Sequence, residues 1–308
     1  MIRHDFTIDV SPAVSSEVSK GEPQWLGARL VAPDKVDATR PTPVFVCVHG
    51  GTFDKRYFDM HVPGREGYSQ AEHFAARGAV VVALDYLGIS DSSRPPGIAT
   101  ARRHVFAAAQ DHAARHVFAR LAAGELHPGL PPLPRLTKIG VGHSMGTMLT
   151  VTQQAAHATY ERVALIGYSV RGVALHRATM PPPPPEGPSD PWERLMAIRR
   201  GLRAEYYLPD TPHDVIEADE AAAVMPPGLI GGEAQTARTV LADAAKITVP
   251  VFFALGEVDI CPAPHDEPGA FTGSNEITFH IAPGTAHAQN LGAGRAALWD
   301  RMLRWAAV

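Results

Sequence analysis

The stretch IGVGHSMGTMLT, residues 139–150, joins two different sequence patterns. An apolar run typical of a buried strand ends at Gly142, and an apolar pattern with helical spacing begins directly after Ser144. Ser144 therefore stands on a sharp turn from a strand into a helix. Gly142 and Gly146 have no side chains to clash where strand and helix approach each other. The serine either caps the helix or is presented by the turn as a nucleophile.

The rest of the chain alternates in the same way between strand and helix patterns. Helical patterns cover 68–78, 98–124, 145–158 and 291–308, and strand-like apolar runs cover 25–33, 43–50, 79–85, 136–142, 162–169, 248–256 and 275–284. Near-continuous apolar strands that alternate with helices predict an α/β fold, a mostly parallel sheet with helices on both faces. The length of 308 residues fits one large domain that carries an insertion.

Residues 171–246 interrupt this alternation. They contain the run PPPPPEGPSDP (181–191), which neither a strand nor a helix interior would carry, followed by helical patterns at 192–205, 219–224 and 233–246. We predict a helical cap inserted between two strands of a core domain that comprises 1–170 and 247–308. The proline run is interpreted as a stiff hinge.

Composition and charge narrow the function classes. The chain has 28 Lys+Arg against 32 Asp+Glu, a net charge of −4 and no dense basic stretch, which argues against a nucleic-acid partner. No secretory signal and no membrane span are visible, so a cytoplasmic location is expected. The two cysteines, Cys47 and Cys261, provide neither a disulfide framework nor metal-ligand spacing, and the histidines form no metal-binding pair.

A serine nucleophile needs a base within hydrogen-bonding reach and a third group that orients the base. Asp259 follows the strand 248–256 in the turn Gly256-Glu257-Val258-Asp259, and His287 follows the strand 275–284. Both therefore lie at the carboxyl ends of strands, where ligands gather in an open α/β sheet. Asp259 is preferred to Glu257 because Gly-x-x-Asp is the usual arrangement. The sequence predicts a triad of Ser144, Asp259 and His287.

A tetrahedral intermediate also needs donors for its oxyanion. The backbone N–H of Met145, directly after Ser144, is one candidate. The other is the N–H of Gly51 in the loop His49-Gly50-Gly51-Thr52 after an early strand, with Thr52 as the alternative. His49 is interpreted as structural. His143 occupies the variable position of the motif and is not expected to act as a second base.

These four motifs, in this order, resemble those of serine hydrolases with the α/β-hydrolase fold. The resemblance covers nearly the whole chain except the insertion and implies an eight-stranded, mostly parallel sheet with a cap after the sixth strand. The stretch ALDYLGISDSSRP (83–95) also resembles a family loop: Asp85 and Gly88 match it, but Ser90 replaces the second glycine. Because of that replacement, the sequence does not predict whether the backbone of this loop follows the family conformation.

A serine at this position implies acyl transfer through an acyl-enzyme, with no metal or organic cofactor. Apolar residues of the insertion suggest a largely apolar pocket and hence a medium-sized hydrophobic carboxylic ester or lactone as substrate: Trp192, Leu195, Met196, Ile198, Leu202, Tyr206, Tyr207 and Leu208. Amide or C–C bond hydrolysis, a cofactor-free perhydrolase and a non-catalytic ligand receptor remain alternatives. A homo-oligomer is compatible with the sequence.

Overall fold

The structure is a computed structural model that describes residues 1–175 and 190–307. In this described part, eight strands form one sheet in the order β1-β2-β4-β3-β5-β6-β7-β8. The strands are β1 (Ile2–Asp9), β2 (Trp25–Ala32), β3 (Thr42–Val48), β4 (Val80–Leu84), β5 (Leu136–His143), β6 (Arg162–Ile166), β7 (Val251–Gly256) and β8 (Ile277–Ala282). β1 pairs antiparallel with β2, and β2 with β4; all other pairs are parallel. The predicted fold class is confirmed.

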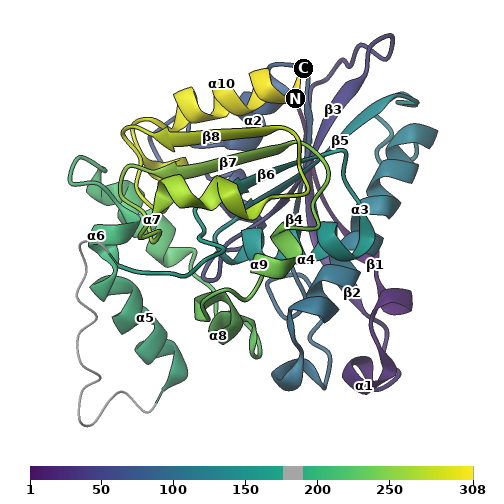
Figure 1. Cartoon of the computed structure of the whole chain (residues 1–308). Helices are drawn as coiled ribbons and strands as arrows, with labels where there is room; N and C mark the ends of the chain where they lie inside the picture. Colours follow the sequence, from purple (N-terminus) through teal and green to yellow (C-terminus); the bar gives the residue numbers. More distant parts are fainter. Residues whose placement is uncertain (176–189, 308) are drawn as a thin grey trace.

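Helices cover both faces of the sheet (Figure 1). α2 (Gln70–Ala75) and α10 (Arg295–Ala306) pack on one face, where Phe45, Phe74 and Trp299 are buried among others. α3 (Arg103–Ala123) and α4 (Met145–His157) pack on the other, and the short α1 (Ser16–Ser19) lies before β2. A sheet buried on both faces explains why its central strands read as continuous apolar runs rather than as alternating ones.

Between β6 and β7 the chain forms the helices α5 (Pro191–Gly201), α6 (Arg203–Tyr206), α7 (His213–Ala221), α8 (Ile230–Gln235) and α9 (Leu241–Ala244). We call these helices the cap. The helix predicted over 192–205 corresponds to α5 and α6, but the other two predicted ranges are wrong in their bounds. α7 begins earlier, directly after Pro212. α8 and α9 are separate helices because the backbone turns to an extended conformation at Thr236, the residue after α8, and Arg238 between the two helices has a φ of 63°. The proline run predicted as a hinge lies outside the described residues except at its end.

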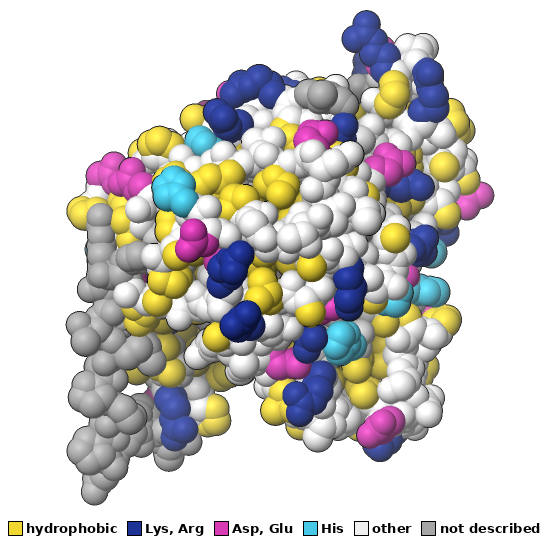
Figure 2. Space-filling view, viewed as in Figure 1, with side chains coloured by type: hydrophobic (Ala, Val, Ile, Leu, Met, Phe, Trp, Pro, Cys, Tyr) yellow, Lys and Arg dark blue, Asp and Glu magenta, His cyan; other side chains and the backbone are white. Residues whose placement is uncertain are grey.

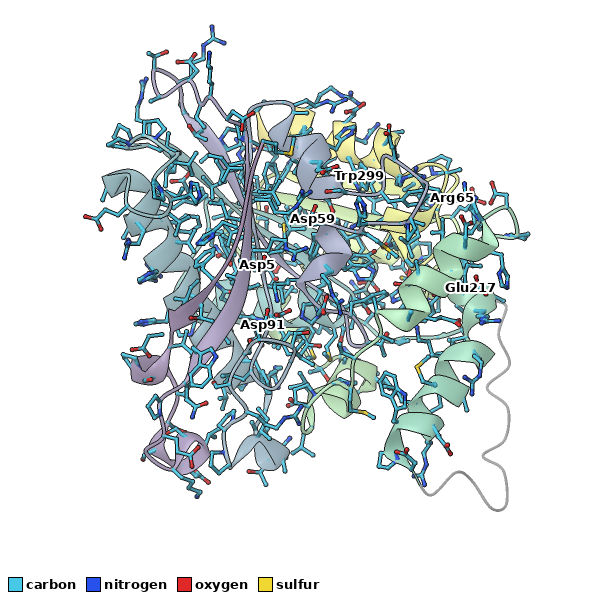
Figure 3. The ribbon with its side chains drawn as sticks, turned by 180° about the vertical axis from the view of Figure 1, so that it is seen from behind. Asp5, Asp59, Arg65, Asp91, Glu217 and Trp299 are labelled. Carbon is cyan, nitrogen blue, oxygen red and sulfur yellow. The ribbon has the colours of Figure 1, made fainter. Side chains whose placement is uncertain are left out.

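The sequence did not predict β1, because that strand lies at the edge of the sheet. Most of its residues are polar and exposed, so it lacks the apolar run of a central strand. Its outward side chains instead form ion pairs, among them Arg29 Nε to Asp5 Oδ1 at 2.7 Å and Arg3 Nε to Asp59 Oδ2 at 2.8 Å. Asp5 and Asp59 are labelled on this side of the molecule in Figure 3. In each of these pairs one partner is exposed to solvent, so the pairs contribute little to stability.

The parallel register brings several strand ends to one edge of the sheet. Val48, the last residue of β3, pairs with Gly142 of β5, and His143 pairs with Ile166, the last residue of β6. The loops that follow β3, β5, β6 and β7 therefore meet at this carboxyl edge, where open α/β sheets bind ligands.

In the described part of the chain, no helix has both the length and the apolar character needed to cross a membrane.

Two histidines are fully buried at this edge. His49 follows β3 and His143 ends β5; they are 0% and 1% exposed. Burial disfavours the charged imidazolium and lowers the pKa of His49 to about 4 and that of His143 to about 3. His143 donates from Nε2 to the backbone oxygen of His287 at 2.9 Å and so supports the loop of His287, which agrees with the expectation that it is not a second base.

We expect His143 to make the fold sensitive to acid. Its pKa in the folded protein is below the usual 6.5, so the unfolded chain binds the extra proton first, and stability is lost as pH falls from about 6.5 toward about 3. In His143→Gln the side-chain amide can still donate to the His287 carbonyl but cannot titrate. The free energy of unfolding should then fall less steeply with acid, by up to about 1.4 kcal/mol per pH unit.

Urea unfolding of both proteins at several pH values between about 7 and about 4.5 measures this difference. Buried Asp85, whose pKa is raised to about 6 mainly by burial, contributes with the opposite sign but equally in both proteins. Equal slopes for the wild type and His143→Gln would contradict the expectation.

Candidate active site

The turn between β5 and α4 has an unusual backbone at Ser144. Its φ is 53° and its ψ is −121°, a region that residues with a Cβ rarely occupy. Ser144 N donates to Ile166 O at 2.8 Å, which holds the turn against β6. The Ser144 side chain makes no capping hydrogen bond to α4, so the interpretation as a helix cap is wrong. The hydroxyl is presented outward instead.

The two glycines of the motif are required by close packing. A Cβ on Gly146 would lie 2.1 Å from the backbone oxygen of Val48 in β3, and one on Gly142 would lie 2.6 Å from Gly146 O. Both distances are far shorter than a van der Waals contact, so any side chain would push α4 away from the sheet. The start of α4 is thereby fixed between β3 and β5, and Ser144 with it.

The structure brings the three predicted catalytic residues together. His287 Nε2 lies 3.0 Å from Ser144 Oγ, and His287 Nδ1 lies 2.7 Å from Asp259 Oδ1. Asp259 and His287 are buried, at 4% and 2% exposure. Because the carboxylate can only accept, Nδ1 carries the proton and Nε2 is the acceptor for the Ser144 hydroxyl. A hydroxyl facing a basic nitrogen that is oriented by a carboxylate is the arrangement that activates a serine.

Asp259 is held by more donors than His287 alone. Its Oδ2 accepts from Gly256 N and from Gln289 Nε2, both at 2.8 Å, and its Oδ1 also accepts from Ile260 N at 2.8 Å. The rejected candidate Glu257 instead accepts from Gly284 N at 2.9 Å. The preference for Asp259 over Glu257 therefore agrees with the geometry, and the carboxylate is fixed in the position that orients the imidazole.

The loop His49-Gly50-Gly51-Thr52 lies against the turn at Ser144. The backbone oxygen of Gly50 accepts from His49 Nδ1 at 2.9 Å, Phe53 N at 3.3 Å and Tyr86 Oη at 3.3 Å, so it is held in the protein interior. In a planar trans peptide the N–H points opposite to the C=O, and the Gly51 N–H is therefore directed away from that interior. The Nδ1 hydrogen bond of His49 to the Gly50 carbonyl agrees with its interpretation as a structural residue.

Gly51 also lies next to the second expected oxyanion donor. A Cβ on Gly51 would be 3.7 Å from Met145 Sδ. Met145 is the first residue of α4, and the first N–H groups of a helix have no partner within it. Within the described residues neither the Gly51 nor the Met145 N–H donates to a protein acceptor. Thr52 lines the same cavity, but the clamped Gly50 carbonyl specifically orients the Gly51 N–H.

An ion-pair network around the buried Lys55 side chain supports this loop from the β4 side. Lys55 Nζ contacts Asp85 Oδ2 at 2.7 Å and Asp91 Oδ2 at 2.5 Å, and Asp91 is labelled in Figure 3. Ser90, in the place of the expected glycine, has a φ of 43°, and its Oγ donates to Asp54 at 2.8 Å. The serine thus adopts the left-handed conformation that the glycine would favour, and its hydroxyl adds a hydrogen bond to the loop after β3.

A cavity of about 450 Å³ opens above Ser144, within the range of small-molecule sites. Cap residues form much of its wall, and no Lys, Arg, Asp or Glu is among the described residues that line it. In Figure 2 the surface is indented between the lobe that carries α5 and the rest of the molecule. The lining residues include Gly51, Ser144, Met145, Tyr168, Val173, Leu175, Leu195, Ile198, Leu202, Tyr206, Ile260 and His287.

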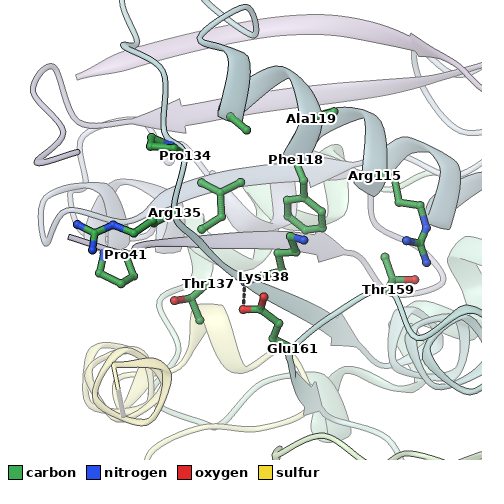
Figure 4. A pocket seen from close by; sticks show the side chains of 12 residues that line it. Pro41, Arg115, Phe118, Ala119, Pro134, Arg135, Thr137, Lys138, Thr159 and Glu161 are labelled. Carbon is green, nitrogen blue, oxygen red and sulfur yellow. Dashed lines mark hydrogen bonds between the residues drawn. The ribbon is translucent and has the colours of Figure 1, made fainter. Parts of the chain in front are cut away.

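A larger cavity of about 750 Å³ lies at the opposite end of β5 (Figure 4). It is bordered by Leu136, the first residue of that strand, and by Phe118, Lys138 and Glu161. Its lining contains no serine, cysteine or histidine that could form a nucleophile–base pair. The smaller cavity, which contains Ser144 and His287, is therefore the candidate active site.

Some residues of the site were not found from the sequence. Gln289, which fixes Asp259, and Arg199 of the cap, which contacts Thr52, carry no motif. Arg199 stands in the pair Arg199-Arg200 on a helix with other charged residues, a pattern typical of a solvated face.

Within residues 1–175 and 190–307, no three His, Cys, Asp or Glu side chains are gathered so that they could hold a metal ion.

Solved structures with low sequence identity share the fold. An esterase from Exiguobacterium antarcticum is 13% identical, with a TM-score of 0.67 over 94% of this chain and 98% of that one. A bromoperoxidase from Bacillus anthracis is 16% identical, with a TM-score of 0.65 over 99% of each chain. An esterase from Thermogutta terrifontis is 14% identical, with a TM-score of 0.63 over 98% of this chain and 100% of that one.

No curated protein sequence matches the chain. A family model described as "Alpha/beta hydrolase family" matches residues 45–305, which contain the Gly51 loop, the turn at Ser144 and both Asp259 and His287. Because that model matches most of its length, this chain belongs to the alpha/beta hydrolase family.

Proposed function

We propose that the protein is a serine hydrolase that cleaves a medium-sized, uncharged, hydrophobic carboxylic ester or lactone through an acyl-enzyme. The observation that carries the proposal is the continuous chain from Ser144 Oγ to His287 Nε2, and from His287 Nδ1 to Asp259, at the base of an apolar cavity. The esterases of similar fold agree with a hydrolase but do not specify the bond that is cleaved.

Each step of the proposed reaction has a residue in position. Ser144 Oγ attacks the substrate carbonyl while His287 Nε2 takes its proton, and Asp259 stabilises the imidazolium that forms. The N–H groups of Gly51 and Met145 donate to the oxyanion of the tetrahedral intermediate. His287 then returns the proton to the leaving alkoxide. A water molecule repeats the steps on the acyl-enzyme and releases the carboxylic acid.

The lining of the cavity supports the choice of an uncharged substrate. Leu195, Ile198 and Leu202 of the cap face it together with Val173 and Ile260, and none of its described residues carries a fixed charge. A charged group brought into such a lining loses its hydration without gaining a partner, which is strongly unfavourable. Apolar acyl groups instead gain free energy from each methylene that they bury.

The nucleophile can be tested with a fluorophosphonate probe. We expect the wild type to be labelled and Ser144→Ala to take no label, because the phosphonylated atom is Ser144 Oγ. Hydrolysis of p-nitrophenyl esters should fall at least about 10⁴-fold in Ser144→Ala and in His287→Ala. Ser16→Ala is the matched control. It removes an exposed hydroxyl that is far from Ser144 in the sequence, and the variant should be labelled like the wild type.

A folded wild type that takes no label would favour the alternative of a ligand receptor. Hydrolysis that is lost in His287→Ala but kept in Ser144→Ala would refute the acyl-enzyme mechanism.

The size and polarity of the substrate can be tested with p-nitrophenyl esters of increasing acyl length. We expect kcat/KM to rise by up to about 4-fold per methylene, the equivalent of about 0.8 kcal/mol, until the cavity is filled, and then to fall. Leu195→Ala enlarges the cavity and should move the optimum to longer chains. Trp192→Ala, at an exposed position of the same helix that does not line the cavity, should leave the optimum in place.

Esters whose acyl chain ends in a carboxylate should be poorer substrates than their methyl esters of equal length, because the carboxylate finds no partner in the cavity. A profile without any length preference that Leu195→Ala leaves unchanged would contradict the proposed substrate class.

A further inference from the structure

Arg199 is buried in the cap, with 2% of its surface exposed, although it is an arginine on a helix whose neighbouring positions are exposed. A buried guanidinium is unfavourable unless its N–H groups find acceptors. Arg199 Nη1 donates to both Thr52 Oγ1 and, at 3.3 Å, to Thr52 O. Nη2 donates to Asp219 Oδ2 and lies 3.4 Å from Tyr207 Oη. The side chain therefore joins α5 and α7 of the cap to the loop after β3.

Aromatic rings fix the guanidinium in that place. Its central carbon lies 4.9 Å from the centre of the Phe53 ring and 5.4 Å from that of the Tyr206 ring. Arginine stacks on aromatic faces in this way while its planar fork donates at the edge. One of the rings belongs to the core and the other to the cap. Arg199 is thus held at the seam between the two and has little freedom to leave Thr52.

Residues 49–52, which we call the oxyanion loop, are held differently at their two ends. The Gly50 carbonyl is clamped by donors of the core. Among the described residues, the Thr52 carbonyl accepts from Arg199 of α5 and, at 3.1 Å, from the N–H of Val224 between α7 and α8, and from no residue of the core. The peptide that joins Gly51 to Thr52 lies between these two anchors. Its orientation, and with it the direction of the adjacent N–H groups, depends on both.

The same short stretch of the cap also holds the loop of His287. His287 N donates to Glu205 O at 3.0 Å, and Ala288 N donates to Tyr206 O at 3.1 Å. The Tyr206 ring packs edge-on against the imidazole, with ring centres 5.1 Å apart. Residues 199–206 therefore contact both the oxyanion loop and the loop of the proposed base.

We propose that Arg199 is a positioning residue that completes the oxyanion hole from the cap by fixing Thr52. The site is then complete only while residues 199–206 of the cap are in contact with the core. The inference rests on the proposed serine hydrolase function for its effect on turnover. Its structural content, the ordering of residues 49–54 by Arg199, is independent of that function.

The chain contains a matched control for Arg199. Arg203 pairs with Glu220 at 2.5–2.6 Å and joins α6 to α7, much as Arg199 pairs with Asp219 and joins α5 to α7. The Arg203 pair is half-exposed and does not reach Thr52. Arg203→Met therefore removes an arginine–carboxylate pair between cap helices without touching the oxyanion loop.

The experiment compares Arg199→Met, Thr52→Val and Arg203→Met with the wild type. Thr52→Val keeps the shape of Thr52 and leaves Arg199 paired with Asp219, so it tests the contact even where Arg199→Met fails to fold. In both Arg199→Met and Thr52→Val we expect exchange with deuterium in residues 49–54 to be at least about 10-fold faster at the Phe53 amide, whose N–H donates to Gly50 O at 3.3 Å. Arg203→Met should exchange there like the wild type.

Turnover supplies the second readout. In Arg199→Met and Thr52→Val, kcat for a p-nitrophenyl ester should fall about 10- to 100-fold with KM nearly unchanged, because a misplaced donor acts on the oxyanion and not on the bound ester. The affinity for an alkyl boronic acid, which forms a tetrahedral adduct with the serine, should fall in parallel. Thr52→Ser, which retains the hydroxyl, should recover most of the loss.

The outcomes separate the inference from the function on which it rests. Unchanged exchange of residues 49–54 in both Arg199→Met and Thr52→Val would overturn the inference, whatever the activity. An equal loss in Arg203→Met would also overturn it, since the effect would then be general to the cap. If the wild type takes no fluorophosphonate label, the proposed function fails, while faster exchange confined to Arg199→Met and Thr52→Val would still support the positioning role.

Discussion

The site depends on the change from strand to helix within one residue. Ser144 has a left-handed φ that costs about 1–3 kcal/mol for a residue with a Cβ, and it keeps this conformation only because its surroundings leave no alternative. β5 is confined between β3 and β6, and α4 packs against the oxygen of Val48 at a distance that only Gly146 permits. The hydroxyl is consequently presented above the edge of the sheet at a position that the core determines.

Much of the site could be predicted from the sequence because it follows from strand order. Asp259 and His287 are far from Ser144 along the chain, but each comes directly after a strand, and parallel strands end at one edge. The seven central and C-terminal strands were recognisable for a related reason, since burial on both faces leaves a continuous apolar run. β1 was missed because an edge strand with one solvated face lacks that run.

The residues that escaped prediction act through long-range contacts. Gln289 and Arg199 are polar side chains whose partners, Asp259 and Thr52, are 30 and 147 positions away in sequence. Local pattern cannot distinguish a buried arginine with such partners from a solvated one. The bounds of the cap helices were also misjudged, because short helices are ended by single residues such as Thr236, which is extended after α8, and not by a change in periodicity.

The oxyanion loop is held by two unlike parts of the protein. The core contributes neutral donors around the Gly50 carbonyl and the buried Lys55–Asp85 pair. The cap contributes a cation at Thr52. The two ends of the loop are thus held by different parts of the fold, and the proposed role of Arg199 makes the complete site depend on both.

The uncharged lining of the cavity has a consequence for the direction of the reaction. The neutral ester proposed as substrate would fit among Leu195, Ile198 and Val173, but its hydrolysis would release an acid that ionises at neutral pH. A carboxylate formed beside Ser144 would meet no Lys or Arg among the described residues of the lining and would be far better solvated outside. The lining that favours entry of such a substrate would thus favour release of the product, which would limit product inhibition without any moving part.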